Sequence, residues 1–122
     1  ERNLSVKAIK AYVYSIALNI IENAVKYADE KKSNPCIQMS SIEQSTEYII
    51  TIIDNGIGID MKLASGKIFQ MYQRFNNTHP GQGFGLFLVK SQMEAMEGKA
   101  ELKSTLGDGT TINLYFPRRL PK

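Results

Sequence analysis

The sequence predicts a two-layer α/β sandwich, in which a sheet of four strands is covered on one face by three helices. Apolar residues recur at helical spacing around position 20 and again around position 90. Each of these segments is followed by a pair of alternating or β-branched stretches, as expected for two hairpins. With 122 residues and 43% hydrophobic composition, the chain suits one domain with its own core, and no second domain fits.

Composition and charge narrow the class of protein. The net charge is only +3 and the basic residues are interspersed with acids, so nucleic-acid binding is disfavoured. The single cysteine, Cys36, cannot form an internal disulfide, and there is neither a signal peptide nor an apolar run of about 18 residues. We therefore expect a cytoplasmic setting without membrane contact by this domain. Because residue 1 is Glu, not Met, we expect residues 1–122 to be a single domain taken from a longer protein.

The first helix is expected to begin near residues 7–11 and to end near residues 28–31, before the break at Pro35. Its apolar face is predicted to comprise Tyr14, Ala17, Leu18, Ile21, Ala24, Val25 and Ala28. The opposite stripe comprises Ser15, Asn19, Glu22, Asn23 and Lys26. Asn costs a helix about 0.5 kcal/mol relative to Ala, so two of them four residues apart need an explanation. We predict that their carbonyl oxygens bind a hard cation, such as a Mg2+ ion that carries a phosphate chain.

Residues 36–42 and 48–54 are expected to form a hairpin, with the second strand the more buried because it is rich in β-branched residues. That strand ends at Asp54, which is followed by Gly56 and Gly58. The two glycines allow the backbone to turn tightly around a neighbouring group. Asp54 is either a solvated strand end or the acceptor of a hydrogen bond from an amino group such as that of adenine.

The glycine-rich segment 81–85 opens directly into a predicted helix over residues 86–96. Such a loop either binds a phosphate through the N–H groups at the helix N-terminus or is only a flexible connection. It does not follow a strand, and its spacing matches neither the dinucleotide-binding pattern nor the P-loop pattern. Arg74, which precedes this segment, is a candidate for a bidentate phosphate contact.

Several further elements complete the predicted order. A short helix is expected over residues 67–72, and Gly98 is expected to cap the helix that precedes it. Strands at 99–104 and 110–116 are expected to form a hairpin through a glycine-containing turn. His79 stands alone in a polar loop, which disfavours a metal or triad role for it. Four methionines are expected to fill the core: Met61, Met71, Met93 and Met96.

In this order the segments resemble the ATP-binding catalytic domain of sensor histidine kinases, within the Bergerat-fold or GHKL ATPase superfamily. The resemblance rests on an N box at 18–27, a first glycine box at 54–59, a phenylalanine box at 68–75, a second glycine box at 81–86 and a closing turn at 107–112. It covers residues 12–117 and implies the Bergerat fold: a two-layer α/β sandwich with a mixed sheet and its helices packed on one face.

The resemblance also implies ATP and Mg2+ as cofactors, and it assigns residues to them. Asn23 would coordinate Mg2+, with Asn19 beside it contacting metal or phosphate. Asp54 would bond the adenine amino group, Gly58 would let the base approach, and Tyr27 would wall the adenine. The remaining nucleotide contacts would come from Lys26, Gly56, Arg74, Gly81, Gly83, Gly85, Leu86 and Thr110. A lid over the nucleotide is implied at residues 76–81, and Phe84 stands where the family commonly has a smaller apolar residue.

Position 19 separates the branches of this superfamily. Gyrase-type ATPases and anti-sigma-factor-like serine kinases typically carry there a Glu that serves as a base, whereas Asn19 cannot take a proton. The resemblance therefore favours a histidine kinase, in which the chain positions the nucleotide and supplies no further catalytic residue. The implied partners are a dimerisation domain of the same parent protein, which carries the phosphoacceptor His, and a response regulator. The alternatives are the serine kinase or gyrase-type class, and a degenerate docking domain that has lost the nucleotide.

Overall fold

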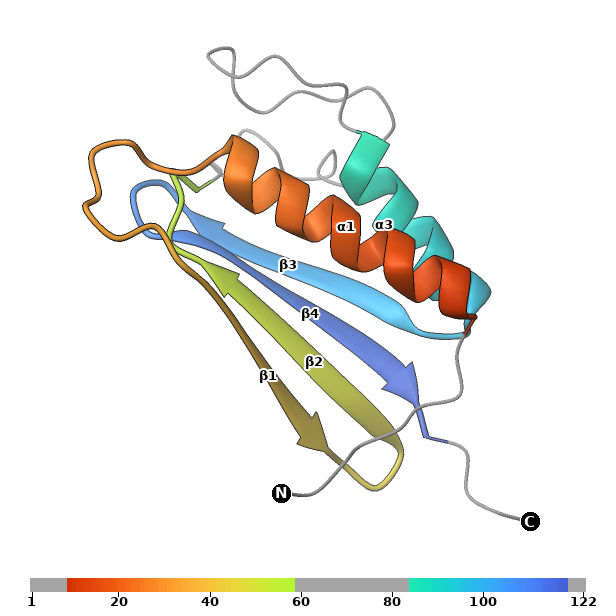
Figure 1. Ribbon diagram of the computed structural model, residues 1–122. Coiled ribbons are helices and arrows are strands. Elements are labelled where there is room, and N and C mark those ends of the chain that lie inside the picture. Colours follow the sequence, from red (N-terminus) through yellow and green to blue (C-terminus); the bar gives the residue numbers. More distant parts are fainter. Residues whose placement is uncertain (1–8, 59–83, 119–122) are drawn as a thin grey trace.

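The computed structural model describes residues 9–58 and 84–118. Within these ranges the elements follow the order helix, hairpin, helix, hairpin (Figure 1). Their bounds are α1 Lys10–Lys26, β1 Ile37–Glu43, β2 Glu47–Asp54, α3 Phe84–Ala95, β3 Lys99–Thr105 and β4 Gly109–Pro117. The helix predicted at 67–72, the lid, His79, Met61 and Met71 lie outside the described residues.

The four described strands form one sheet in the order β1-β2-β4-β3. Both predicted hairpins are confirmed, because β1 pairs with β2 and β3 pairs with β4, and β2 pairs with β4 at the centre of the sheet. Helices α1 and α3 lie side by side on one face of the sheet (Figure 1). The predicted two-layer sandwich is thus confirmed, with one change: all three described strand pairings are antiparallel, whereas a mixed sheet was expected.

The hydrophobic core lies between the helix layer and the inner face of the sheet. It is built from Ile16, Ile20, Ile52, Leu86, Val89, Met93, Met96, Leu102, Ile112, Leu114 and Phe116. Met93 and Met96 fill it as predicted. From Ile112 onward every second residue of β4 is buried, which is the period expected of a strand with one covered face. The edge strand β1 is exposed along nearly its whole length, and β2 is the more buried partner in that hairpin, as predicted.

The apolar face predicted for α1 is wrong at most of its positions. The residues that α1 buries are Ile16, Ile20 and Ala24. Exposed residues include Tyr14 and Val25, at 71% and 67% exposure, together with Leu18 and Ile21. The helix therefore carries two apolar stripes, and the core selects the one that the hydrophobic periodicity did not single out. Because each residue of a helix is rotated by about 100° from the one before it, the two sets of positions lie on different sides of α1.

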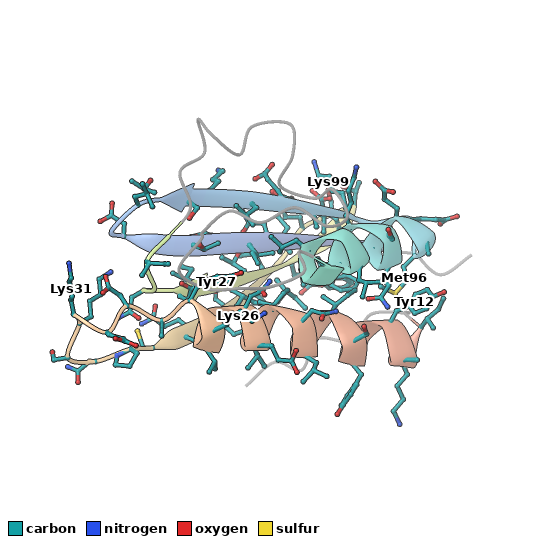
Figure 2. All side chains as sticks on the ribbon, turned by 90° about the horizontal axis from the view of Figure 1, so that it is seen from above. Tyr12, Lys26, Tyr27, Lys31, Met96 and Lys99 are labelled. Atoms are coloured by element: carbon teal, nitrogen blue, oxygen red, sulfur yellow. The ribbon has the colours of Figure 1, made fainter. Side chains whose placement is uncertain are left out.

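The two helices run in opposite directions, which places the start of α3 beside the second half of α1 (Figure 1). The backbone N–H of Ile9 points at the Met96 sulfur, 3.4 Å away, so the beginning of α1 lies at the end of α3. Tyr12 and Met96 mark this end of the helix layer in Figure 2. A rise of about 1.5 Å per residue then brings the first turn of α3, which lies 9–12 residues before Met96, level with residues 18–21 of α1, a stretch that includes Asn19 and ends two residues before Asn23.

The predicted glycine cap of α3 is displaced by one residue. Glu97, not Gly98, adopts the left-handed conformation, with φ of 63°. Gly98 then donates its backbone N–H to the Met93 carbonyl at 2.8 Å, which closes the helix end. Gly98 is still required, because a Cβ there would collide with the carbonyl oxygen of Tyr115.

The burial pattern of α1 predicts that truncating a buried aliphatic side chain to Ala lowers the free energy of unfolding more than truncating an exposed one. Ile20→Ala removes a side chain that is 3% exposed and should lower the free energy of unfolding by about 2–5 kcal/mol. The matched control Leu18→Ala, at a position 44% exposed, should cost less than about 1 kcal/mol. Urea unfolding followed by circular dichroism measures both. Equal losses would contradict the orientation of α1 described here.

Candidate functional site

Three segments that are distant in sequence meet at the C-terminal end of α1. They are the helix end at Tyr27, the turn that follows β2, and the turn between β3 and β4. The backbone N–H of Ile57 donates to the Tyr27 carbonyl at 2.9 Å, and the N–H of Gly107 donates to the Ile57 carbonyl at 2.9 Å. These two bonds link the three segments in series. We call this meeting point the three-segment junction.

Glycines allow the junction to close. A Cβ at Gly56 would lie 2.5 Å from the Tyr27 carbonyl oxygen, far inside van der Waals contact. A Cβ at Gly58 would collide with the Thr105 carbonyl, and one at Gly109 with the Asp54 carbonyl. Gly58 and Gly109 also have φ of 77° and 105°, which residues with a side chain rarely adopt. The tight turn predicted at Gly56 and Gly58 is therefore confirmed, and the nearby backbone carbonyls explain why glycine is required at both positions.

Asp54 places its carboxylate at this junction. Its Oδ1 accepts the backbone N–H of Gly56 at 2.9 Å, and Asp54 faces Thr110 directly across the β2–β4 pairing. Partial burial raises the pKa of the Asp54 carboxyl above its usual 3.8, and this effect outweighs the backbone N–H groups of Gly56 and Thr110 and the charge of Lys32, which lower it. The carboxylate is thus partly withdrawn from water but held by N–H donors, as a recognition group for a hydrogen-bond donor would be.

Thr110, predicted as part of the pocket, is fixed by a neighbour on β3. The Ser104 hydroxyl donates to the Gly109 carbonyl at 2.8 Å and also lies 2.8 Å from the Thr110 hydroxyl. Because Ser104 has one hydroxyl proton, the Thr110 hydroxyl must donate to Ser104 in this arrangement. The Thr110 oxygen is therefore held in a defined orientation beside Asp54.

The two asparagines of α1 lie on the side of the helix that adjoins α3. Asn19 and Asn23 follow Tyr12 by 7 and 11 positions, so all three share one side to within about 20°. Both asparagines are partly buried. The Asn19 amide nitrogen lies 3.5 Å from the Ser15 hydroxyl, and the Asn23 side chain makes no hydrogen bond to another described residue. Neither of their carbonyl oxygens accepts a hydrogen bond from another described side chain.

These donors fit a hard divalent cation. Carboxamide oxygens suit Mg2+, which binds through one or two protein oxygens and completes its shell with water and phosphate. Among the described residues there is no cluster of three or more His, Cys, Asp or Glu side chains, so nothing there favours a closed cage for a softer metal. Cys36 is exposed and unpaired.

Lys26 and Tyr27 stand together at the C-terminal end of α1 (Figure 2). The Lys26 ammonium lies 5.9 Å from the centre of the Tyr27 ring. Lys26 is exposed, so it can reach a phosphate without leaving an apolar site, whereas Tyr27 is partly buried against the junction. The helix ends at this pair, earlier than the predicted end at residues 28–31.

The remaining predicted site residues divide into two groups. Gly85 and Leu86 lie in the first turn of α3, where backbone N–H groups have no partner within the helix, and the Leu86 side chain anchors this turn in the core. Arg74, Gly81 and Gly83 lie outside the described residues, so their placement stays a prediction.

Sequence reasoning missed four residues that hold the junction together. Ser104 and Gly109 support Thr110 and Asp54 as described above. Asn55 bridges two segments: its Nδ2 donates to the Asn34 carbonyl at 2.8 Å and its Oδ1 accepts from the Cys36 N–H at 2.9 Å. Lys32 donates to backbone carbonyls of the junction. Only Gly109, in a glycine-containing turn, carried a local signal; the others act across the fold.

The described helices contain none that is long and apolar enough to cross a membrane. Residues 9–120 match the family described as "Histidine kinase-, DNA gyrase B-, and HSP90-like ATPase".

Two curated relatives and one solved structure are similar to this chain. Cyanobacterial phytochrome A of a Nostoc species is 34% identical over 101 residues, which cover 81% of this chain and 13% of that protein. Sensor histidine kinase AtsR of Burkholderia thailandensis is 28% identical over 123 residues, which cover 98% of this chain and 20% of that protein. The solved structure of mycobacterial sensor histidine kinase MprB superposes with a TM-score of 0.76 at 21% identity, covering 92% of this chain and 74% of that one.

These comparisons agree with the fold described above. The solved structure shows the same fold, and the family match spans both helices and all four strands. The chain spans 13% to 20% of the length of the two curated relatives. By the match over residues 9–120, this chain belongs to the histidine kinase-, DNA gyrase B- and HSP90-like ATPase family, as an ATP-binding domain of the sensor histidine kinase type.

Proposed function

We propose that this chain binds Mg-ATP and donates the γ-phosphoryl group to a histidine on a separate dimerisation domain of the same parent protein. A response regulator would then take the phosphoryl group from that histidine. One observation supports the proposal: the turn that holds the Asp54 carboxylate is hydrogen-bonded to Tyr27 at the C-terminal end of α1, and Asn23 and Asn19 lie about one and two helical turns before Tyr27. This arrangement suits a ligand with a base at one end and phosphates at the other.

The base end recognises adenine through Asp54. Its carboxylate accepts hydrogen bonds, none of the described side chains donates one to it, and the adenine amino group is a donor of this kind. A Cβ at Gly58 would point at the Thr105 carbonyl, so this glycine supports the base end by letting the turn close, and the Thr110 hydroxyl oxygen is held beside the carboxylate. Tyr27 walls the base at the end of α1.

Three kinds of group would act on the phosphates: backbone N–H groups, a lysine and two asparagines. The first-turn N–H groups of α3, including those of Gly85 and Leu86, would donate hydrogen bonds to phosphate oxygens at the positive end of the helix. Lys26 adds an exposed cation. Asn23 holds the metal through its carboxamide oxygen, with Asn19 contacting metal or phosphate. When bound, Mg2+ supplies positive charge that stabilises the phosphates during transfer.

The described part of the chain positions the nucleotide and supplies no base. Asn19 cannot take a proton, and Glu22 is exposed and rotated by about 100° from Asn23 around α1. This favours an acceptor that needs little proton removal, such as the imidazole nitrogen of a histidine, over a water or serine nucleophile. It sets the gyrase-type and serine-kinase alternatives below the histidine kinase. We take residues 1–122 as one domain of a longer sensor kinase, consistent with the share of its relatives that it spans.

The metal assignment predicts a specific loss in Asn23→Ala. Removing the carboxamide oxygen should abolish most of the gain in ADP affinity that Mg2+ confers on the unsubstituted chain, a change of about tenfold or more, since about 1.4 kcal/mol corresponds to tenfold. Isothermal titration of ADP with Mg2+ and with EDTA measures this gain. The control Asn34→Ala changes an exposed asparagine in the α1–β1 loop and should retain it. Undiminished Mg2+ dependence in Asn23→Ala would remove Asn23 as the ligand.

The adenine assignment predicts that Asp54→Asn weakens adenine nucleotides selectively. A hydrogen bond to a charged acceptor is worth about 1.5–3 kcal/mol, so affinity for ADP should fall by about 10-fold to 100-fold, with little loss for GDP. Titration of both nucleotides measures the difference. An equal loss for ADP and GDP would contradict the role of Asp54.

The raised pKa of Asp54 predicts two pH effects of known sign. Adenine binding needs the ionised carboxylate, so ADP affinity should fall on acidification with a midpoint above 3.8. In the absence of nucleotide the opposite holds: a folded-state pKa above the unfolded value means that stability falls as pH rises through this window. Asp54→Asn removes that cost, so its melting temperature at neutral pH should not drop. A clear drop would show that the ionised carboxylate stabilises the fold.

A further inference from the structure

Lys32 makes an unusual set of contacts for a lysine in a loop. Its ammonium donates to the Asn55 carbonyl at 2.8 Å and to the Gly107 carbonyl at 2.7 Å, and it lies 3.5 Å from the Gly56 carbonyl. An ammonium has three N–H donors, and here each faces a backbone oxygen. The Lys32 backbone N–H also donates to the Asp29 carbonyl at 3.0 Å, which fixes the turn that presents the side chain.

The acceptors belong to two different segments of the three-segment junction. Asn55 and Gly56 follow β2, whereas Gly107 lies in the turn between β3 and β4. The lysine itself comes from the α1–β1 loop, 23 and 75 positions away from these two acceptor sites. A single cation thus ties the turn after β2 to the hairpin turn beside it, in parallel with the Gly107–Ile57 backbone bond.

This tie acts on the groups that face the base. The Gly56 N–H that holds the Asp54 carboxylate belongs to the same turn whose carbonyls Lys32 binds. Among the described residues that shift the titration of Asp54, Lys32 is the one charged side chain; the other groups are the backbone N–H donors of Gly56 and Thr110. Lys32 therefore favours the ionised carboxylate and also holds the peptide groups that orient it.

We propose that Lys32 is a positioning residue that holds the turn after β2 so that the Asp54 carboxylate meets the adenine amino group. Lys32 does not touch the nucleotide itself; it sets purine selectivity through Asp54. The inference rests on the proposed nucleotide function and deepens it at the base end.

Removing the ammonium while keeping the aliphatic stem tests this role. In Lys32→Met, ADP affinity at neutral pH should fall by about tenfold, whereas the affinity for IDP, which lacks the adenine amino group, should change by less than about twofold. The midpoint of the acid-induced loss of ADP binding should move to higher pH, because a charge that favours the carboxylate is gone. Lys32→Arg, which keeps a cationic donor, should fall between Lys32→Met and the unsubstituted chain.

Lys31→Met is the matched control. Lys31 is the neighbouring residue and is exposed, and its side chain points outward from the loop at the left of Figure 2. The Lys31 backbone N–H donates to the Asp29 carboxylate, and a side-chain substitution leaves this hydrogen bond in place. Lys31→Met should therefore keep both the ADP preference and the pH midpoint.

A double substitution separates positioning from general loosening of the fold. In an Asp54→Asn background, Lys32→Met should produce no further change in the ratio of ADP to IDP affinity, because the group through which it acts is absent. A further loss there, or an equal loss of ADP and IDP affinity in the single variant, would overturn the inference. So would an unchanged ADP preference in Lys32→Met.

The outcome for the unsubstituted chain distinguishes the two levels of the proposal. An ADP preference over IDP in that chain that survives Lys32→Met overturns only the role of Lys32. If the unsubstituted chain binds neither nucleotide, the proposed function fails, and the inference about Lys32 fails with it. Should Lys32→Met not fold, Lys32→Arg carries the same comparison.

Discussion

The structure depends on the closing of three segments around Asp54. Backbone bonds from Ile57 to Tyr27 and from Gly107 to Ile57 connect the end of α1, the end of β2 and the β3–β4 turn. The approach is so close that a Cβ at Gly56, Gly58 or Gly109 would enter the backbone of a neighbouring segment. A partly buried carboxylate at such a point costs free energy unless donors face it, and here the N–H groups of Gly56 and Thr110 do so. The junction thus holds the Asp54 carboxylate in place for the contact with the base that we propose.

The helix layer prepares the other end of the site. The core holds α1 through Ile16 and Ile20 and holds the first turn of α3 through Leu86. Packing of these residues turns Asn19 and Asn23 toward α3, so two poor helix formers are kept where their oxygens can bind a ligand. The cost of placing them within α1 is small beside the burial of the aliphatic residues that orient them.

Local chemistry explains what could be predicted from sequence. The hairpins follow from alternation and turn glycines, and Asp54, Gly56 and Gly58 were identified because a strand end, a carboxylate and two glycines adjoin in the chain. The buried face of α1 could not be predicted, because the exposed side is as apolar as the buried one: it carries Tyr14, Leu18, Ile21 and Val25. Periodicity finds such stripes but cannot rank two of them. Lys32, Asn55 and Ser104 escaped for a different reason: their roles arise from partners that the fold brings together, and lysine in a polar loop carries no signal of its own. The ligand-binding roles of all the predicted site residues stay predictions, and Arg74, Gly81 and Gly83 also lie outside the described residues.

The central claim is that one nucleotide reaches from Asp54, which contacts its base, to Asn23, which binds its metal ion. A crystal structure of the chain with Mg2+ and a non-hydrolysable ATP analogue tests it most directly. The account predicts the adenine amino group within hydrogen-bond distance of the Asp54 carboxylate and the Asn23 oxygen at about 2.1 Å from the metal ion. A nucleotide bound with its base away from Asp54, or a metal ion held without Asn23, would contradict it.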